Sequence, residues 1–137
     1  MPVFGALQTA ASGMNVFRTW LDATADNISN MQSVSLTPGG APFKSELVIA
    51  QANGDVNDTA NHGAHVVEIA RNADTAHPLY DPTHPLADPV TGEVNYPGVD
   101  LGVEMVNMVA AQRGYQANLQ SFQAAKDAYQ AALRLGH

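Results

Sequence analysis

Side chains that could bind a metal ion gather in the middle of the chain. His62 and His65 are spaced as a ligand pair, and imidazole with carboxylate is an ordinary donor set for zinc and related metals. Further candidate ligands follow in the sequence at His77, Asp81, His84 and Asp88. The histidines lie in turn-rich stretches without a HExxH helix to fix their geometry. We therefore predict no metal site and no cofactor.

Three acidic residues of the same region have the chemistry of a general acid and base: Asp81, Asp88 and Glu93. Such a pair needs a pocket that moves the two pKa values apart, and the sequence shows no rigid scaffold for one. The chain has no cysteine, no GxSxG nucleophile motif and no glycine-rich phosphate-binding loop. We predict no catalytic residues. One alternative is a small metal-dependent enzyme that uses the loop histidines.

The longest regular pattern predicts a helix over residues 101–135. This stretch contains no proline, and a large apolar residue recurs every seventh position, at Leu101, Met108, Tyr115, Phe122 and Tyr129. A repeat of seven keeps one stripe of a helix facing a partner over many turns. Residues four positions after three of these widen the stripe, namely Met105, Leu119 and Leu133.

The same helix carries a second stripe of smaller residues, at Val103, Ala110, Ala117, Ala124 and Ala131. At 100° per residue, an offset of two positions places it about 200° from the first stripe. Two opposite faces of the helix therefore lack charge. We expect this helix to pack between neighbours, some of them on other chains. The alternative is an ordinary buried helix in a compact domain.

Residues 3–30 predict a second helix with a matching pattern. Leu7, Met14, Leu21 and Ile28 repeat every seven residues, and Ala10, Phe17, Thr24 and Met31 each follow by three. This is the a/d pattern of helices that pack along a seam. Gly13 and Gly114 each cost their helix about 1 kcal/mol relative to alanine, so we expect a neighbouring helix to approach the backbone closely at both positions.

The middle of the chain is irregular and partly β. We predict a linker over residues 31–42, short strands over residues 43–51 and 64–70, and a polar turn between them. Five prolines within residues 78–97 permit neither a helix nor a central strand, so we expect an extended segment with a turn at Thr91 and Gly92. This segment is a candidate for lying along a neighbour, and the alternative is a surface loop.

The formal charge of −7 lies entirely in the middle, because residues 31–100 hold two basic residues against nine acidic ones. The neutral ends suit side-by-side packing of many copies, and no basic cluster indicates nucleic acid binding. We predict a mainly α fold whose terminal helices pair as a coiled-coil-like hairpin and pack with neighbouring subunits. The three parts are an N-terminal helix over residues 1–31, an extended middle over residues 32–100 and a C-terminal helix over residues 101–137.

Two terminal motifs resemble those of the basal-body rod proteins of the bacterial flagellum. Residues 6–34 contain a small-Ser-Gly-Met element and an Ala-x-Asn-Ile-Ser-Asn element. The C-terminal helix contains Glu-Met-Val at residues 104–106 and an Arg-x-Tyr-x-Ala-Asn element. The residues that carry this resemblance are Ala25, Asn27, Asn30, Arg113, Tyr115, Ala117 and Asn118.

A middle motif narrows the resemblance to the proximal rod protein of the FlgC type. It runs over residues 80–88 and continues in Gly-Glu-Val at residues 92–94. Its main residues are Tyr80, Asp81, Pro82, His84 and Pro85. Pro97-Gly98-Val99 departs from the family's Pro-Asn-Val before the last helix, and residues 35–62 show no match.

The resemblance implies a non-enzymatic subunit of the rod, the drive shaft that crosses the periplasm and transmits motor torque. Its implied partners are copies of itself, other rod proteins, components at the rod base and the flagellar type III export apparatus, with no nucleic acid and no small-molecule substrate. The N-terminus lacks the basic region of a cleavable signal, so we expect export without signal cleavage. The alternative is a free-standing coiled-coil adaptor that is secreted. From the two helical patterns, the residues expected to pack subunits together are Leu7, Met14, Phe17, Leu21, Ile28, Met108, Tyr115, Ala117, Leu119, Phe122, Ala124 and Tyr129.

Overall fold

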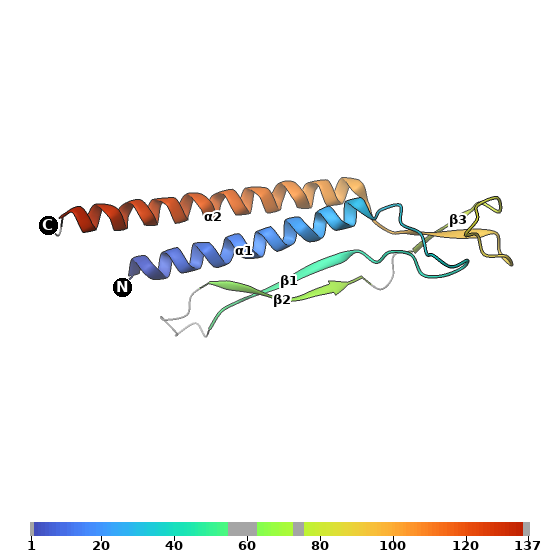
Figure 1. Ribbon diagram of the computed structural model, residues 1–137, viewed down its shortest axis with the longest axis horizontal. Coiled ribbons are helices and arrows are strands. Elements are labelled where there is room, and N and C mark those ends of the chain that lie inside the picture. The colour runs from blue at the N-terminus through green and yellow to red at the C-terminus, as the bar shows by residue number, and fades with distance from the viewer. Residues whose placement is uncertain (1, 55–62, 73–75, 136–137) are drawn as a thin grey trace.

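The computed structural model describes residues 2–54, 63–72 and 76–135. In chain order the elements are α1 (Pro2–Ser29), β1 (Glu46–Ala52), β2 (Ala64–Arg71), β3 (Ala76–Tyr80), β4 (Glu93–Pro97) and α2 (Leu101–Leu135). The molecule is elongated, with two long antiparallel helices at one end and the β3–β4 hairpin at the other (Figure 1). Two helices joined by a partly β middle agree with the predicted fold class.

Helix α1 is the middle of three layers. It packs against α2 on one side and against the β1–β2 hairpin on the other, whereas α2 contacts no strand (Figure 1). The expectation that the C-terminal helix packs between neighbours, some of them on other chains, stays a prediction, since within the described part of a single chain α2 packs against α1 alone. The hairpin lies against α1 because Ser12 and Asn27 of this helix bond to the backbones of Ala64 and Glu46.

Helix α2 begins at an aspartate cap. The Oδ1 atom of Asp100 accepts hydrogen bonds from the backbone N–H groups of Gly102 at 2.7 Å and Val103 at 3.2 Å. These groups have no partner inside the helix, so the carboxylate satisfies them and also favours the positive end of the helix dipole. The Asp100 cap lies three residues after Pro97, where β4 ends, and α2 begins at the next residue, Leu101.

The β1–β2 hairpin confirms both strands predicted around residues 43–51 and 64–70. The strands are antiparallel, with Glu46 opposite Arg71 and Ala52 opposite Ala64. The register shifts between Ile49 and Ala50, because β2 has one more residue than β1. An ion pair joins the Nη2 atom of Arg71 to the Oε1 atom of Glu46 at 3.6 Å.

The proline-rich segment forms a second hairpin that the sequence did not predict. Strands β3 and β4 pair antiparallel, with Pro78 opposite Asn95. A two-stranded sheet has only edge strands, and an edge strand tolerates a proline because one side of it forms no ladder bonds. The predicted turn residue Gly92 has a φ of 71°, and its carbonyl oxygen accepts the backbone N–H of Asp81 at 3.0 Å.

Candidate assembly surface

Two glycines allow α1 and α2 to approach closely. A β-carbon on Gly13 would collide with the side chain of Asn118, and a β-carbon on Gly114 would collide with the ring of Phe17. Each glycine thus lies under a side chain of the opposite helix, and that side chain is four residues beyond the other glycine. The predicted close approach at both glycines is confirmed.

The predicted packing residues divide into two groups. Ten are half-buried on the paired helices of one chain, where Phe17 meets Gly114 and the rings of Phe4 and Tyr129 meet edge to face at 5.3 Å. These ten are Leu7, Met14, Phe17, Leu21, Ile28, Met108, Tyr115, Leu119, Phe122 and Tyr129. The other two, Ala117 and Ala124, are exposed. The larger group therefore packs within the subunit, and only the alanines face away.

The buried face of α2 contains residues that the sequence pattern did not predict. Met105 and Leu133 were expected to widen the stripe, but both are more than half exposed. Ala111 instead is fully buried, and Asn118 is half-buried. These residues follow Met108 and Tyr115 by three positions, the same interval that identified the α1 pattern. That interval, applied to α2, was the signal that would have found them.

Asn27 connects three elements. Its side chain is 2% exposed, and its Nδ2 atom donates to the carbonyl oxygen of Glu46 at 3.0 Å and to the Oε1 atom of Glu104 at 3.2 Å. Its Oδ1 atom accepts the backbone N–H of Glu46 at 2.7 Å. This one amide from α1 therefore holds the start of β1 and the first turn of α2, which explains an asparagine at this motif position.

Ser12 fastens the other end of the hairpin to α1. Its Oγ atom accepts the backbone N–H of Ala64 at 3.1 Å and donates to the carbonyl oxygen of Thr9 at 2.8 Å. Gly63 lies directly against Ser12, so there is no space for a larger side chain there. The small-Ser-Gly-Met element thus supplies an anchor for β2 and the gap that Asn118 fills.

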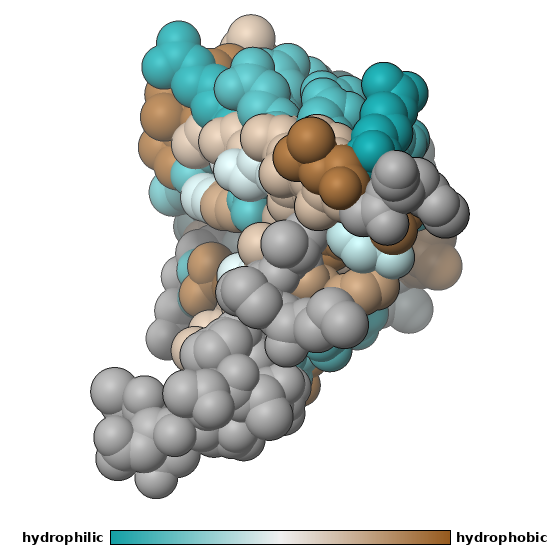
Figure 2. All heavy atoms as spheres, turned by 90° about the vertical axis from the view of Figure 1, so that its left-hand side faces the viewer, coloured by the Kyte–Doolittle hydropathy of each residue, from teal (hydrophilic) through white to brown (hydrophobic). Residues whose placement is uncertain are grey.

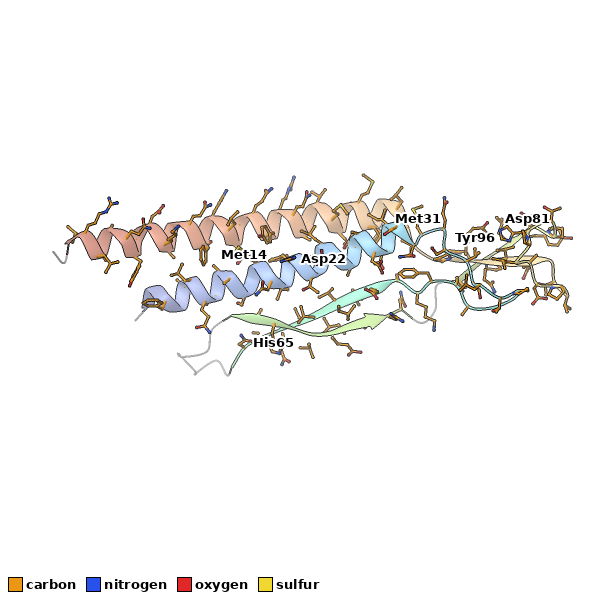
Figure 3. The ribbon with its side chains drawn as sticks, viewed as in Figure 1. Met14, Asp22, Met31, His65, Asp81 and Tyr96 are labelled. Atoms are coloured by element: carbon orange, nitrogen blue, oxygen red, sulfur yellow. The ribbon has the colours of Figure 1, made fainter. Side chains whose placement is uncertain are left out.

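The described candidate metal and acid–base residues lie on two separate hairpins, with His77, His84, Asp88 and Glu93 in the same one as Asp81. His65 lies on the β1–β2 hairpin, whereas Asp81 lies in the distal β3–β4 hairpin (Figure 3). No group of three histidine or acidic residues that could hold a metal ion occurs within residues 2–54, 63–72 and 76–135. His62 lies outside these residues.

The middle motif forms an ordered turn. Thr83 donates both its hydroxyl, at 2.6 Å, and its backbone N–H, at 3.1 Å, to the Oδ1 atom of Asp81. These bonds, with a smaller contribution from nearby His84, hold the pKa of the Asp81 carboxyl below its ordinary value of 3.8. The Nδ1 atom of His84 accepts the backbone N–H of Leu86 at 3.1 Å. Pro82 and Pro85 are exposed, as is Tyr80, so this motif shapes a turn.

The protein exposes more surface than a compact monomer of its size. Its accessible area is 9261 Å², whereas a compact protein of 14.4 kDa exposes about 6,800 Å². Much of the exposed apolar surface belongs to α2. The exposed large apolar residues of this helix are Leu101, Val103, Met105, Val106, Val109, Leu133 and Leu135.

The stripe of small residues on α2 is exposed at all five positions. The stripe was predicted to lie on an uncharged face opposite the first stripe, but the outer side of α2 carries charge. Arg113, Asp127 and Arg134 are exposed there, spaced by fourteen and then seven residues. Figure 2 shows hydrophilic residues along the top of the molecule, where α2 lies, and apolar residues lower on its sides. The buried face is centred between the Tyr115 and Asn118 lines, which turns the small residues onto a flank.

Comparisons with known proteins find similarity to flagellar basal-body rod proteins. The family model described as "Flagellar basal body rod FlgEFG protein C-terminal" matches residues 90–135. The flagellar basal-body rod protein FlgC of Aquifex aeolicus is 33% identical over 130 residues, covering 95% of this chain and 94% of the relative. The FlgC proteins of Escherichia coli O157:H7 and Bacillus subtilis are 32% and 28% identical, each covering 99% of both chains.

Neither described helix has a stretch long and apolar enough to span a membrane. The matched relatives give no support to a free-standing adaptor, since each is named as a basal-body rod protein. The chain belongs to the FlgC family of flagellar basal-body rod proteins.

Proposed function

We propose that this chain is a structural subunit of the flagellar rod, which self-assembles through its terminal helices and transmits motor torque without catalysing a reaction. The observation that carries the proposal is the exposed apolar surface of α2, a helix whose interface with α1 is already filled. Residues 1–31 and 101–137 would form the axial core of the assembly, and residues 32–100 would extend from it.

The α1–α2 pair is suited to bear a mechanical load. Gly13 and Gly114 bring the two backbones together, and Asn27 ties the helices to the hairpin. An interface filled on both sides in this way resists sliding, because any shift opens cavities or produces collisions. A stiff helix pair passes torque to its neighbours with little loss to internal motion.

Assembly would cover the apolar residues that α2 leaves exposed. Complete burial of one such side chain contributes roughly 1.5 to 3 kcal/mol, and a side chain that is half exposed has about half of that to gain. The exposed alanine stripe lets a further helix approach closely on the flank of α2. Terminal segments without net charge add little repulsion between copies.

The partners we propose are copies of the chain, other rod proteins and components at the rod base, within the part of the basal body that spans the periplasm. Export would use the flagellar type III apparatus, without cleavage of a signal peptide. The absence of cysteine fits a chain that folds after export without needing disulfide formation.

The substitution Ala117→Glu tests this proposal. It places a charged side chain on the exposed stripe, away from the α1–α2 interface, and should abolish incorporation into isolated basal bodies and swimming while leaving expression and export intact. Gln116→Glu is the matched control, because it adds the same charge to the adjacent exposed residue. Swimming by the Ala117→Glu strain at the rate of the control would contradict the proposed use of this flank.

A further inference from the structure

A collar of exposed apolar residues surrounds the start of α2. We call Leu101, Val103, Met105, Val106 and Val109 the α2 collar; they are 42 to 69% exposed. Part of the collar lines a shallow groove of about 340 Å³ that ends at Arg113. Glu104, the one acidic residue of this segment, points away from the collar to Asn27. The collar is therefore apolar, with a single cation at its edge.

A second apolar surface lies on the β1–β2 hairpin. Leu47 and Ile49, which we call the hairpin patch, are 61% and 43% exposed, and they lie on the same face of β1 because they are two residues apart. The exposed Glu68 lies on the same face, opposite Ile49 in the strand register. The Arg71 cation at the end of the same strand pairs with Glu46. The patch is therefore apolar, with an anion beside it.

The two surfaces lie at the same level of the molecule and on opposite sides of α1. The Asn27 amide shows this directly, because its Nδ2 atom contacts both Glu46 at the start of β1 and Glu104 in the first turn of α2. No strand contacts α2, so neither surface covers the other within one chain. A neighbouring copy placed alongside, without a large axial shift, presents its hairpin patch at the height of the collar.

We propose that the occupant of the α2 collar is the hairpin patch of a second copy of this chain. Charge favours this pairing, because Arg113 at the collar meets Glu68 at the patch. Contact between two collars would oppose two arginines, and contact between two patches would oppose two glutamates. Neither Arg113 nor Glu68 has an ion pair among the described residues. A contact between two different surfaces leaves one collar and one patch free on every pair of copies, so it extends to further copies in a closed ring or an open array.

Cysteine crosslinking tests this contact, since the chain has no cysteine of its own. Val109→Cys and Leu47→Cys variants, each with a different affinity tag, are expressed together in cells that lack the chromosomal copy, and basal bodies are isolated under oxidising conditions. The expected product is a disulfide-linked dimer that carries both tags. Dimers carrying one tag only, or a crosslink from Val109→Cys to a different rod protein, would overturn the inference.

The charge pair provides a second measurement with intact apolar surfaces. Arg113→Glu should lower the yield of the mixed dimer about tenfold, and adding Glu68→Arg should restore it. Both residues are exposed, so unchanged melting temperatures verify the fold. If a cysteine variant is not incorporated, the swimming rate is measured in strains without added cysteines. Arg113→Glu should then lower the swimming rate, and adding Glu68→Arg should restore it. A double variant that swims no better than Arg113→Glu would overturn the contact.

This inference rests on the proposed function, and the two fail differently. Absence of the tagged wild-type chain from basal bodies would overturn both. Presence of both cysteine variants in basal bodies without the mixed dimer would overturn the contact alone and leave the chain a rod subunit with another arrangement.

Discussion

The ring of Phe17 on α1 occupies the space where a β-carbon of Gly114 on α2 would lie. The ring is held from its other side by Trp20, whose ring stacks on it with centroids 6.1 Å apart. Phe17 therefore has little freedom to move aside. The closeness of the two helices at this level depends on the absence of a side chain at residue 114.

The substitution Gly114→Ala should destabilise the protein by up to about 2 kcal/mol. Alanine stabilises a helix by about 1 kcal/mol relative to glycine, but overpacking against a constrained ring costs roughly 1 to 3 kcal/mol, so the collision outweighs the gain in most of that range. Urea unfolding followed by circular dichroism measures the difference.

Gly5→Ala is the control for that measurement. It makes the same change in α1 at a position where a β-carbon would meet nothing within 4 Å. It should stabilise the protein by about 0.5 to 1 kcal/mol. Equal stabilisation by both substitutions would show that the Phe17 ring yields and that Gly114 is not required for the approach.

Removal of the Asn27 side chain should cost about 1 to 3 kcal/mol of folding free energy. In Asn27→Ala the backbone N–H and carbonyl of Glu46 lose their partner, and buried polar groups without partners carry a cost of this size. Asn15→Ala on the exposed side of α1 should change stability by less than about 0.5 kcal/mol. Thermal unfolding of both variants compares them, and similar melting temperatures would argue against the role of Asn27 as a tie.

The sequence was sufficient to predict the two helices and their close approach. Strong periodicity specified α1, and the glycines at positions 13 and 114 indicated contact because nothing else compensates their cost in a helix. The start of α2 was also predictable, since prolines end at Pro97 and the apolar repeat begins at Leu101.

The layering and the ties between elements were not predictable, for physical reasons. Asn27 bonds to residues 19 and 77 positions away, and no local pattern reports such distant partners. The pairing of β3 with β4 was missed because Pro78 argues against a central strand, and a sequence does not show that both strands are edges. A spacing of four residues in place of three placed Met105 and Leu133 on the wrong side of α2.

Ser12→Ala should loosen one end of the β1–β2 hairpin without unfolding the helices. The substitution removes the oxygen that accepts the backbone N–H of Ala64, while the hairpin stays attached through Asn27 at its other end. Hydrogen exchange of the Ala64 amide should accelerate about five- to thirtyfold, as expected for a lost bond worth about 1 to 2 kcal/mol. Ser29→Ala, whose hydroxyl bonds only within α1 among the described contacts, should leave that amide unchanged.

The Asp81 turn should show a pH dependence that Thr83 controls. The hydroxyl and backbone N–H of Thr83 lower the pKa of Asp81 below 3.8, so the folded turn favours the carboxylate. The resulting stabilisation is complete above the ordinary pKa of aspartate and is lost as the pH falls through the lowered value. Carboxyl carbon NMR titration should therefore show a rise in the Asp81 pKa toward 3.8 in Thr83→Val, which loses the hydroxyl. Thr83→Ser keeps the hydroxyl and should keep the low pKa, and an Asp81 pKa that is the same in all three proteins would show that this hydrogen bond does not hold the turn.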